Sequence, residues 1–125
     1  MILADTSVWV DHLHRTDPVL SRLFNSGEIL VHPVVLGELA LGSIPDRLAT
    51  LRILRKLPRA VVAQDEEVLQ LIEDWKLYGS GIGYSDAELL ASVLLTSGSR
   101  LWTRDRSLHR VADQLSLAAV FPGSS

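Results

Sequence analysis

Short apolar runs alternate with amphipathic stretches along this chain of 125 residues. The runs are too brief to be packed helices and are bounded by Gly, Pro or Asp, so we interpret them as buried strands. We expect strands at about residues 2–4, 29–31, 60–63, 101–103 and 117–120. Apolar strands separated by helices are typical of a parallel sheet that is covered on both faces. The alternation therefore predicts an α/β protein with a parallel sheet.

Helix start and stop signals fill the intervals between these runs. Pro18 and Pro33 suit the first turn of a helix, while Gly27, Gly42 and Pro58 suit positions just beyond a helix end. We expect helices at about residues 8–13, 18–25, 33–41, 46–57, 65–78, 85–95 and 107–115. The third and fourth of these form a helical hairpin.

Three local details are also predicted. Ser85 and Glu88 have the spacing of a capping box, which places a helix start at Ser85. In the helix at 65–78 the apolar spacing turns Leu69 and Ile72 inward. Trp102 lies in a predicted strand, so we expect it in the core rather than on the surface as a platform for stacking bases.

The composition bounds the class of protein. A chain of this length fits one domain, residues 1–125, with a polar tail at 123–125. The formal net charge of -3 argues against coating nucleic acid by bulk charge, so any such contact needs a local basic face. The lack of cysteine excludes disulfides, a thiolate nucleophile and a cysteine zinc site, and it is compatible with the cytoplasm. We expect neither a signal peptide nor a membrane span.

Four acidic residues stand in unusual places. Asp5 and Asp105 each follow an apolar run directly, whereas Glu38 and Asp86 interrupt segments that otherwise read as buried helices. Gly37, beside Glu38, would allow another backbone to approach closely. An unpaired buried carboxylate loses several kcal/mol of solvation, or its pKa rises until it is neutral. Function is therefore a strong reason for acids at these four positions.

The expected sheet brings two of the acids to one edge. Ligands of open parallel sheets bind beyond the carboxyl ends of the strands, and Asp5 and Asp105 both fall there. Ser7 and Thr103 place a hydroxyl two residues from each carboxylate. Taken singly, Asp5, Asp105 and Asp86 could be helix caps or dipole partners, and Glu38 could pair with a buried arginine.

A shared location changes that interpretation, because gathered carboxylates repel one another unless a cation lies between them. All-oxygen ligands select hard divalent ions such as Mg²⁺ or Mn²⁺ over zinc. A carboxylate-bound Mg²⁺ that keeps several waters suits hydrolysis of a phosphodiester.

The motifs resemble those of the PIN-domain ribonucleases, in particular the VapC-type toxins of toxin–antitoxin modules. The similarity extends over essentially the whole chain. It rests on Asp5-Thr6-Ser7 with Trp9, on Gly37-Glu38-Leu39, on Asp86-Ala87 before Leu89-Leu90-Ala91, and on Leu101-Trp102-Thr103-Arg104-Asp105. Each piece is short, but their order and spacing within one chain are specific.

The resemblance implies a three-layer α/β/α fold with a central, mainly parallel sheet, and it also implies a function and a site. Asp5, Glu38, Asp86 and Asp105 match the metal-binding and catalytic acids of that family, and Ser7 and Thr103 match polar residues beside them. The implied activity is Mg²⁺- or Mn²⁺-dependent endonucleolytic cleavage of RNA by a cytoplasmic homodimer. The implied partner is a small cognate antitoxin that also binds operator DNA.

Charge is segregated along the chain. Residues 47–59 carry five basic and no acidic side chains, whereas residues 65–74 carry five acidic and no basic ones. The basic segment could hold phosphates that flank the scissile bond, hold an acidic part of an antitoxin, or be a solvated helix face. Arg104 and Arg106 flank Asp105 and are nearer candidates for RNA contact, although either could instead pair with Glu88 or another surface acid.

Two other functional classes remain open. A phosphoacceptor signalling domain has a similar length and an acidic pocket at its strand ends. It would need paired acids after the first strand and a lysine after the last, and Asp5 stands alone. A non-enzymatic interaction module would use the hairpin at 33–57 to bind a partner and keep the acids as caps.

Overall fold

The computed structural model describes residues 1–121, and the polar tail predicted at 123–125 lies outside them. Within that range the elements, in chain order, are β1 (Ile2–Ala4), α1 (Thr6–His14), α2 (Pro18–Asn25), β2 (Ile29–Leu30), α3 (Pro33–Leu41), α4 (Arg47–Leu54), α5 (Asp65–Asp74), α6 (Tyr84–Leu95), β3 (Arg100–Trp102) and α7 (Arg106–Gln114). None of these helices combines the length and the apolar character that a membrane span requires.

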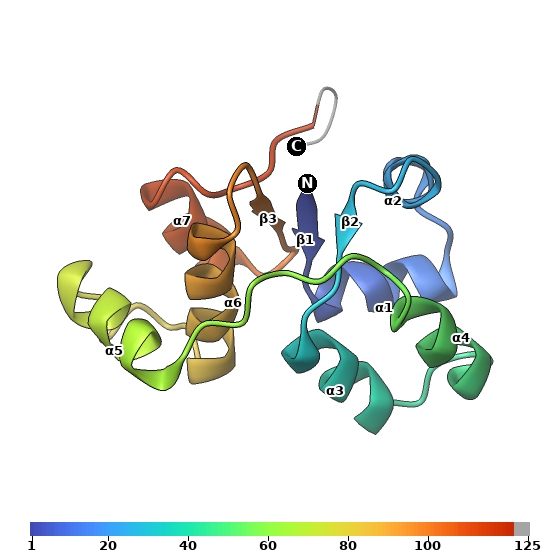
Figure 1. The fold of residues 1–125 in the computed structure, drawn as a ribbon, viewed down its shortest axis with the longest axis horizontal. Coiled ribbons are helices and arrows are strands. Elements are labelled where there is room, and N and C mark those ends of the chain that lie inside the picture. The colour runs from blue at the N-terminus through green and yellow to red at the C-terminus, as the bar shows by residue number, and fades with distance from the viewer. Residues whose placement is uncertain (122–125) are drawn as a thin grey trace.

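The sheet is parallel, with strand order β2-β1-β3. Leu3 of β1 is in register with Leu30 on one side and Leu101 on the other. Leu3 and Ala4 are adjacent, so their side chains point to opposite faces of the sheet, and both are 0% exposed. Both faces are thus covered, and the predicted α/β/α fold is confirmed. Figure 1 shows α5, α6 and α7 on the β3 side and α2, α3 and α4 on the β2 side.

Two segments predicted as strands are not strands. Residues 60–63 contribute only one parallel bridge beside them, between Val31 and Arg59. The amide of Val61 donates instead to the Thr96 hydroxyl and that of Ala63 to the Ser92 hydroxyl, both on or next to α6. The segment therefore crosses α6 with its amides satisfied by side chains, which the apolar pattern does not reveal.

The segment at 117–120 fails in a different way. It pairs through a single parallel bridge between Leu101 and Ala118. Beyond it Val120 is 80% exposed. Single bridges thus occupy the outer positions of the expected sheet.

The helix predicted at 65–78 ends earlier, at Asp74. Lys76 adopts a left-handed conformation with φ of 52°, and the amide of Leu77 folds back to donate to the carbonyl of Ile72 at 2.9 Å. Val68 and Leu71 form the buried face of α5, whereas Leu69, predicted to point inward, is 54% exposed. The apolar spacing thus predicted the helix but misassigned Leu69.

The start of α6 is also shifted. The predicted capping box of Ser85 and Glu88 is wrong, because the N-cap is Gly83 and the third helical residue is Asp86. The Asp86 carboxylate accepts the Gly83 amide at 3.1 Å. One of the four singled-out acids therefore has a local capping role as well.

The predicted hairpin is present, since α3 packs against α4. The guanidinium of Arg47, at the start of α4, donates through Nε and NH2 to the carbonyl of Ala40 near the end of α3, at 2.9 and 2.7 Å. The fourth helix is shorter than predicted and ends at Leu54. The packing of α4 and the hydrogen bonds of Arg47 therefore fix the position of α3.

A buried histidine joins the two halves of the molecule. His32 is 1% exposed, and its Nδ1 accepts the Val34 amide at 3.0 Å as the N-cap of α3. The proton of the neutral ring is therefore on Nε2, which donates to the Ser92 hydroxyl of α6 at 2.9 Å. Burial lowers the pKa of His32 and keeps the ring neutral.

The His32–Ser92 contact generates a stability prediction. Ser92→Ala leaves the Nε2–H of His32 and the amide of Ala63 without an acceptor. We expect the free energy of unfolding, measured in urea, to fall by about 1–3 kcal/mol. Ser97→Ala, at an exposed position just after α6, is the matched control and leaves it unchanged. Equal stability of the two variants would contradict the role assigned to Ser92.

Candidate functional site

Asp5 lies at the carboxyl end of the central strand and is 6% exposed. It is the N-cap of α1, where its Oδ1 accepts the amides of Ser7 at 3.0 Å and Val8 at 3.4 Å and the Ser7 hydroxyl. Its Oδ2 accepts the Thr103 hydroxyl at 2.6 Å. Burial raises the pKa of Asp5, and these hydrogen bonds oppose that rise.

Two hydroxyls link the loops after β1 and β3. Thr103 Oγ1 donates to Asp5 and accepts the amide of Asp105 at 3.0 Å. Ser7 Oγ also donates to Asp5 and accepts the amide of Arg104 at 3.0 Å. The structure therefore places Ser7 and Thr103 beside Asp5, where each hydroxyl holds the loop that carries Asp105.

Glu38 is presented by α3, which packs against both α1 and α6. It is exposed, whereas the sequence pattern read this segment as buried, and its Oε1 accepts the Thr6 hydroxyl at 2.6 Å. The buried residues of α3 are Val35 and Leu39. A Cβ placed on Gly37 would meet nothing within 4 Å, so the close backbone approach expected there is also wrong.

Asp105 is exposed and caps α7, where its Oδ1 accepts the Leu108 amide at 2.9 Å. Asp86 is in the first turn of α6. Burial is the largest factor that raises the pKa of Asp86, and the charges of Asp105, Asp5 and Glu38 raise it further. All three other acids thus act electrostatically on Asp86.

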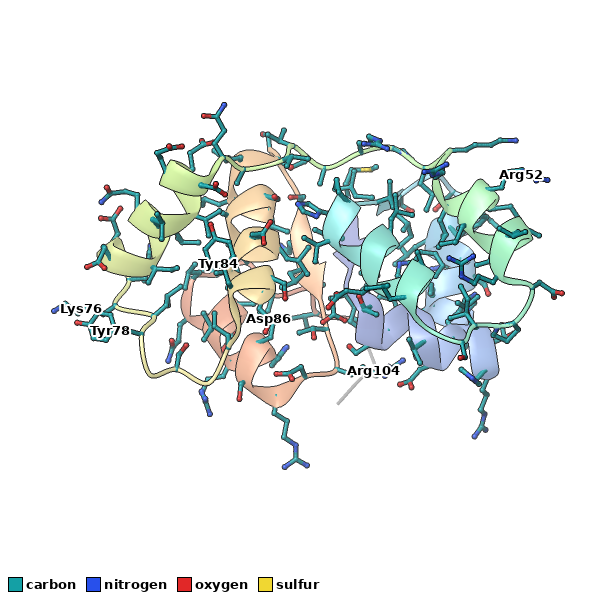
Figure 2. The ribbon with its side chains drawn as sticks, turned by 90° about the horizontal axis from the view of Figure 1, so that it is seen from below. Arg52, Lys76, Tyr78, Tyr84, Asp86 and Arg104 are labelled. Carbon is teal, nitrogen blue, oxygen red and sulfur yellow. The ribbon has the colours of Figure 1, made fainter. Side chains whose placement is uncertain are left out.

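Figure 2 looks onto the carboxyl ends of the strands. It shows Asp86 near the middle of the molecule, at the start of α6, between the half that carries α5 and the half that carries α3 and α4. This is the sheet edge at which the sequence placed a ligand site.

The donor chemistry of this site fits a hard divalent cation. The charges of Asp105, Asp5 and Glu38 raise the pKa of Asp86 beyond the effect of burial, and a cation would relieve that repulsion. Oxygen ligands of this kind suit Mg²⁺ or Mn²⁺. Within residues 1–121, no three His, Cys, Asp or Glu side chains are grouped closely enough to enclose an ion as they stand. Each carboxylate oxygen described above accepts a hydrogen bond from another group of the protein.

Arg104 is held by partners that the sequence analysis did not identify. Its guanidinium pairs with Asp11 through Nε at 2.9 Å and with Asp17 through NH2 at 2.7 Å. It also lies over the ring of Trp102, 5.8 Å from its centroid. These ion pairs offset the charge of Arg104, whereas Arg106 is exposed and makes no ion pair within residues 1–121. The alternative of a surface acid was correct in kind, though Glu88 is not the partner.

Trp102 is partly exposed, not fully in the core as predicted. Its ring contacts that of Phe121 edge to face, with the centroids 4.7 Å apart. The sequence analysis did not predict the hydrogen bond from Thr6 to Glu38, although the position of Thr6 directly after Asp5 indicated that it lies at the site. Asp17 gave a second signal, because it precedes Pro18 and caps α2 through the amides of Val19 and Leu20. Its additional contact with Arg104 depends on the fold and has no local signature.

Comparison with known proteins agrees with this geometry. The model of the PIN domain family matches residues 2–114. The chain belongs to the PIN domain family. Ribonuclease VapC32 of Mycobacterium tuberculosis is 45% identical to this PIN domain over 118 residues, which cover 94% of this chain and 95% of the relative. The same values hold for the protein of strain CDC 1551 / Oshkosh and for that of strain ATCC 25618 / H37Rv. The predicted resemblance is thus confirmed.

The electrostatics of Asp86 generate a pH prediction for the metal-free PIN domain. Because its folded pKa is raised above the ordinary value of 3.8, the ionised carboxylate lowers stability near neutral pH, and protonation restores stability as the pH falls. In EDTA, Asp86→Asn should therefore melt at a higher temperature than the parent at pH 7. This advantage should shrink as the pH falls towards about 4.

The matched control is Asp113→Asn, which removes an exposed carboxylate of α7. Its melting temperature at pH 7 should stay close to that of the parent, because surface substitutions of this kind change stability little. An advantage of Asp86→Asn that grows as the pH falls would show that the pKa of Asp86 is not raised.

Proposed function

We propose that this PIN domain is a metal-dependent endoribonuclease and the toxin of a toxin–antitoxin pair. One observation carries the proposal. Three carboxylates, those of Asp5, Glu38 and Asp105, act on the carboxyl group of Asp86 at the start of α6, in a chain that is 45% identical to a ribonuclease over 94% of its length. The substrate is RNA, the cofactor is Mg²⁺ or Mn²⁺, and the inhibitor is a cognate antitoxin.

In the proposed mechanism Asp5, Glu38 and Asp105 supply most of the ligands, directly or through water. When bound, the ion supplies an activated water and neutralises charge on the phosphodiester. Asp86 orients the attacking water or helps to hold a second ion. Ser7 and Thr103 fix the orientation of the Asp5 carboxylate by donating one hydrogen bond to each of its oxygens.

The neutral variants of the acids test this division of roles. Asp5→Asn keeps an N-cap side chain, since Asn caps helices as well as Asp does, but it removes a charged ligand. We expect the cleavage rate of labelled RNA to fall by about a hundredfold or more, because metal coordination supplies several kcal/mol of transition-state stabilisation. The same loss is expected for Glu38→Gln, Asp86→Asn and Asp105→Asn. Asp113→Asn should cleave like the parent.

Stability separates the catalytic role from a structural one. Because neutral variants relieve repulsion, the melting temperature should stay equal or rise in metal-free buffer. Markedly lower melting temperatures in all four variants would mean that the acids serve the fold as caps and ion-pair partners. That outcome would favour the interaction module.

Metal removal gives an independent test. EDTA should abolish cleavage, and added Mg²⁺ or Mn²⁺ should restore it. Either ion should also raise the melting temperature of the parent, since a ligand that binds only the folded state stabilises it, and should do so less in Asp5→Asn. Full cleavage in EDTA would overturn the metal dependence and leave the ribonuclease assignment intact.

Toxicity and inhibition complete the proposal. Induced expression of the parent in a bacterial host should arrest growth, and expression of Asp5→Asn should not. A small reading frame next to the gene is expected to encode the antitoxin, and its co-expression should relieve the arrest. A homodimer and a cytoplasmic location are further parts of this proposal and rest on the family resemblance.

A further inference from the structure

A groove of about 600 Å³ lies between α3 and α4. Its apolar lining comes from both helices and includes Leu36, Ala40, Leu48 and Leu51. Leu48 is 71% exposed, so the groove is open to solvent and its apolar floor is accessible. Basic side chains complete the lining, namely Arg47, Arg52, Arg55 and Arg59.

None of these four cations has a carboxylate partner within the described residues, and Arg47 donates instead to the carbonyl of Ala40. Both ion pairs within residues 1–121 are made by Arg104, so Arg52, Arg55 and Arg59 make none there. We call these three the groove arginines. The chain has no acidic residue from 47 to 64, and none lines the groove. Arg52 is in the last turn of α4 and Arg55 is its C-cap, where the helix dipole favours a cation, but Arg59 lies beyond the helix.

The groove begins where the acidic site ends. Gly37 of α3 lines the groove, and the next residue, Glu38, belongs to the acidic site. Since an α-helix with its side chains is about 10–12 Å across, the two regions are roughly one helix width apart. Figure 2 shows α3 between Asp86 and α4, with Arg52 at the outer edge of α4.

RNA fits this surface better than an acidic protein segment does. A strand held at the acidic site carries phosphates that four carboxylates repel, so its flanking phosphates need cations nearby. Arg104 is already paired, whereas the groove arginines are not. A strand that leaves the site over Glu38 and Gly37 enters the groove directly. There the apolar floor matches the faces of the bases, and the guanidinium groups match phosphate oxygens.

We propose that the groove arginines bind the phosphates of the RNA strand a few nucleotides from the scissile bond. This inference rests on the proposed ribonuclease function and adds to it a second anchoring surface on the substrate. It separates binding from chemistry, because the acids act on the scissile phosphate and the arginines act only on its flank.

The test measures binding of a fluorescent single-stranded RNA of about fifteen nucleotides, by anisotropy at several KCl concentrations. Cleavage is prevented by using Asp86→Asn as the background, with Mg²⁺ present throughout. The groove variant is Arg52→Gln, Arg55→Gln and Arg59→Gln combined. For single strands each lost phosphate contact lowers the steepness of log affinity against log salt by about 0.7, so the slope should fall by about 2. Affinity at about 0.1 M KCl should fall about tenfold or more.

Two matched variants control for charge. Arg15→Gln, Arg22→Gln and Lys76→Gln combined removes the same net charge from exposed positions outside the groove and should leave the slope unchanged. The triple Lys variant of the groove arginines keeps the point charges and should keep most of the slope. Thermal melts of all three should match that of the background, since the altered side chains are exposed.

Cleavage by the parent and the groove variant, without Asp86→Asn, gives a second readout. An RNA of about fifteen nucleotides should show a KM about tenfold higher with an unchanged kcat. An RNA of about four nucleotides reaches only the acidic site, so its kcat/KM should be the same for both proteins. This contrast would not arise from a general loss of fold.

Several results would overturn the inference. An unchanged salt slope, an equal loss in the control variant, or an equal loss for the short RNA would each do so. Loss of binding to an acidic apolar peptide, with RNA binding intact, would assign the groove to a protein partner instead. If the parent cuts RNA and the groove variant behaves identically, only this inference fails. If the parent neither binds nor cuts RNA, the proposed function fails with it.

Discussion

The hydrogen bonds of the Asp5 carboxylate connect the fold to the site. One oxygen caps α1 and the other accepts a hydroxyl from the end of β3, so a single side chain joins the central strand, its helix and the neighbouring loop. The group is nearly inaccessible to water, and burial raises its pKa even though four donors oppose that rise. The surrounding donors offset the cost of burying the carboxyl group and fix its orientation.

The acidic site could be predicted from sequence because its signals are local. An apolar run followed by Asp marks both a strand end and a helix cap, and this placed Asp5 and Asp105 at one edge of a parallel sheet. Glu38 was placed correctly on α3, but its burial was not, because the apolar neighbours that suggested a buried segment face away from it. Periodicity predicts which face of a helix is apolar and does not reveal which face a neighbouring helix leaves uncovered.

The errors share a physical cause. The amides of residues 61 and 63 bond to side chains of Thr96 and Ser92, about thirty residues away, and the segment resembles a strand only in composition. The ion pairs of Arg104 join residues 11 and 17 to the far end of the chain. Contacts of this type depend on how two elements are brought together in space, so the residues next to them in the sequence do not predict them. The net charge of the chain is negative, so it did not predict the groove lined by arginines beside α4.

Residues that are far apart in the sequence meet at the site, and this has a consequence for synthesis. Thr103 follows Asp5 by 98 residues, and Asp5 gains its bond from Thr103 only when both have been made. A nascent chain that stops before residue 103 carries three of the four acids but lacks both Asp105 and the hydroxyl that holds Asp5. The set of four acids is complete only once the ribosome has added residue 105.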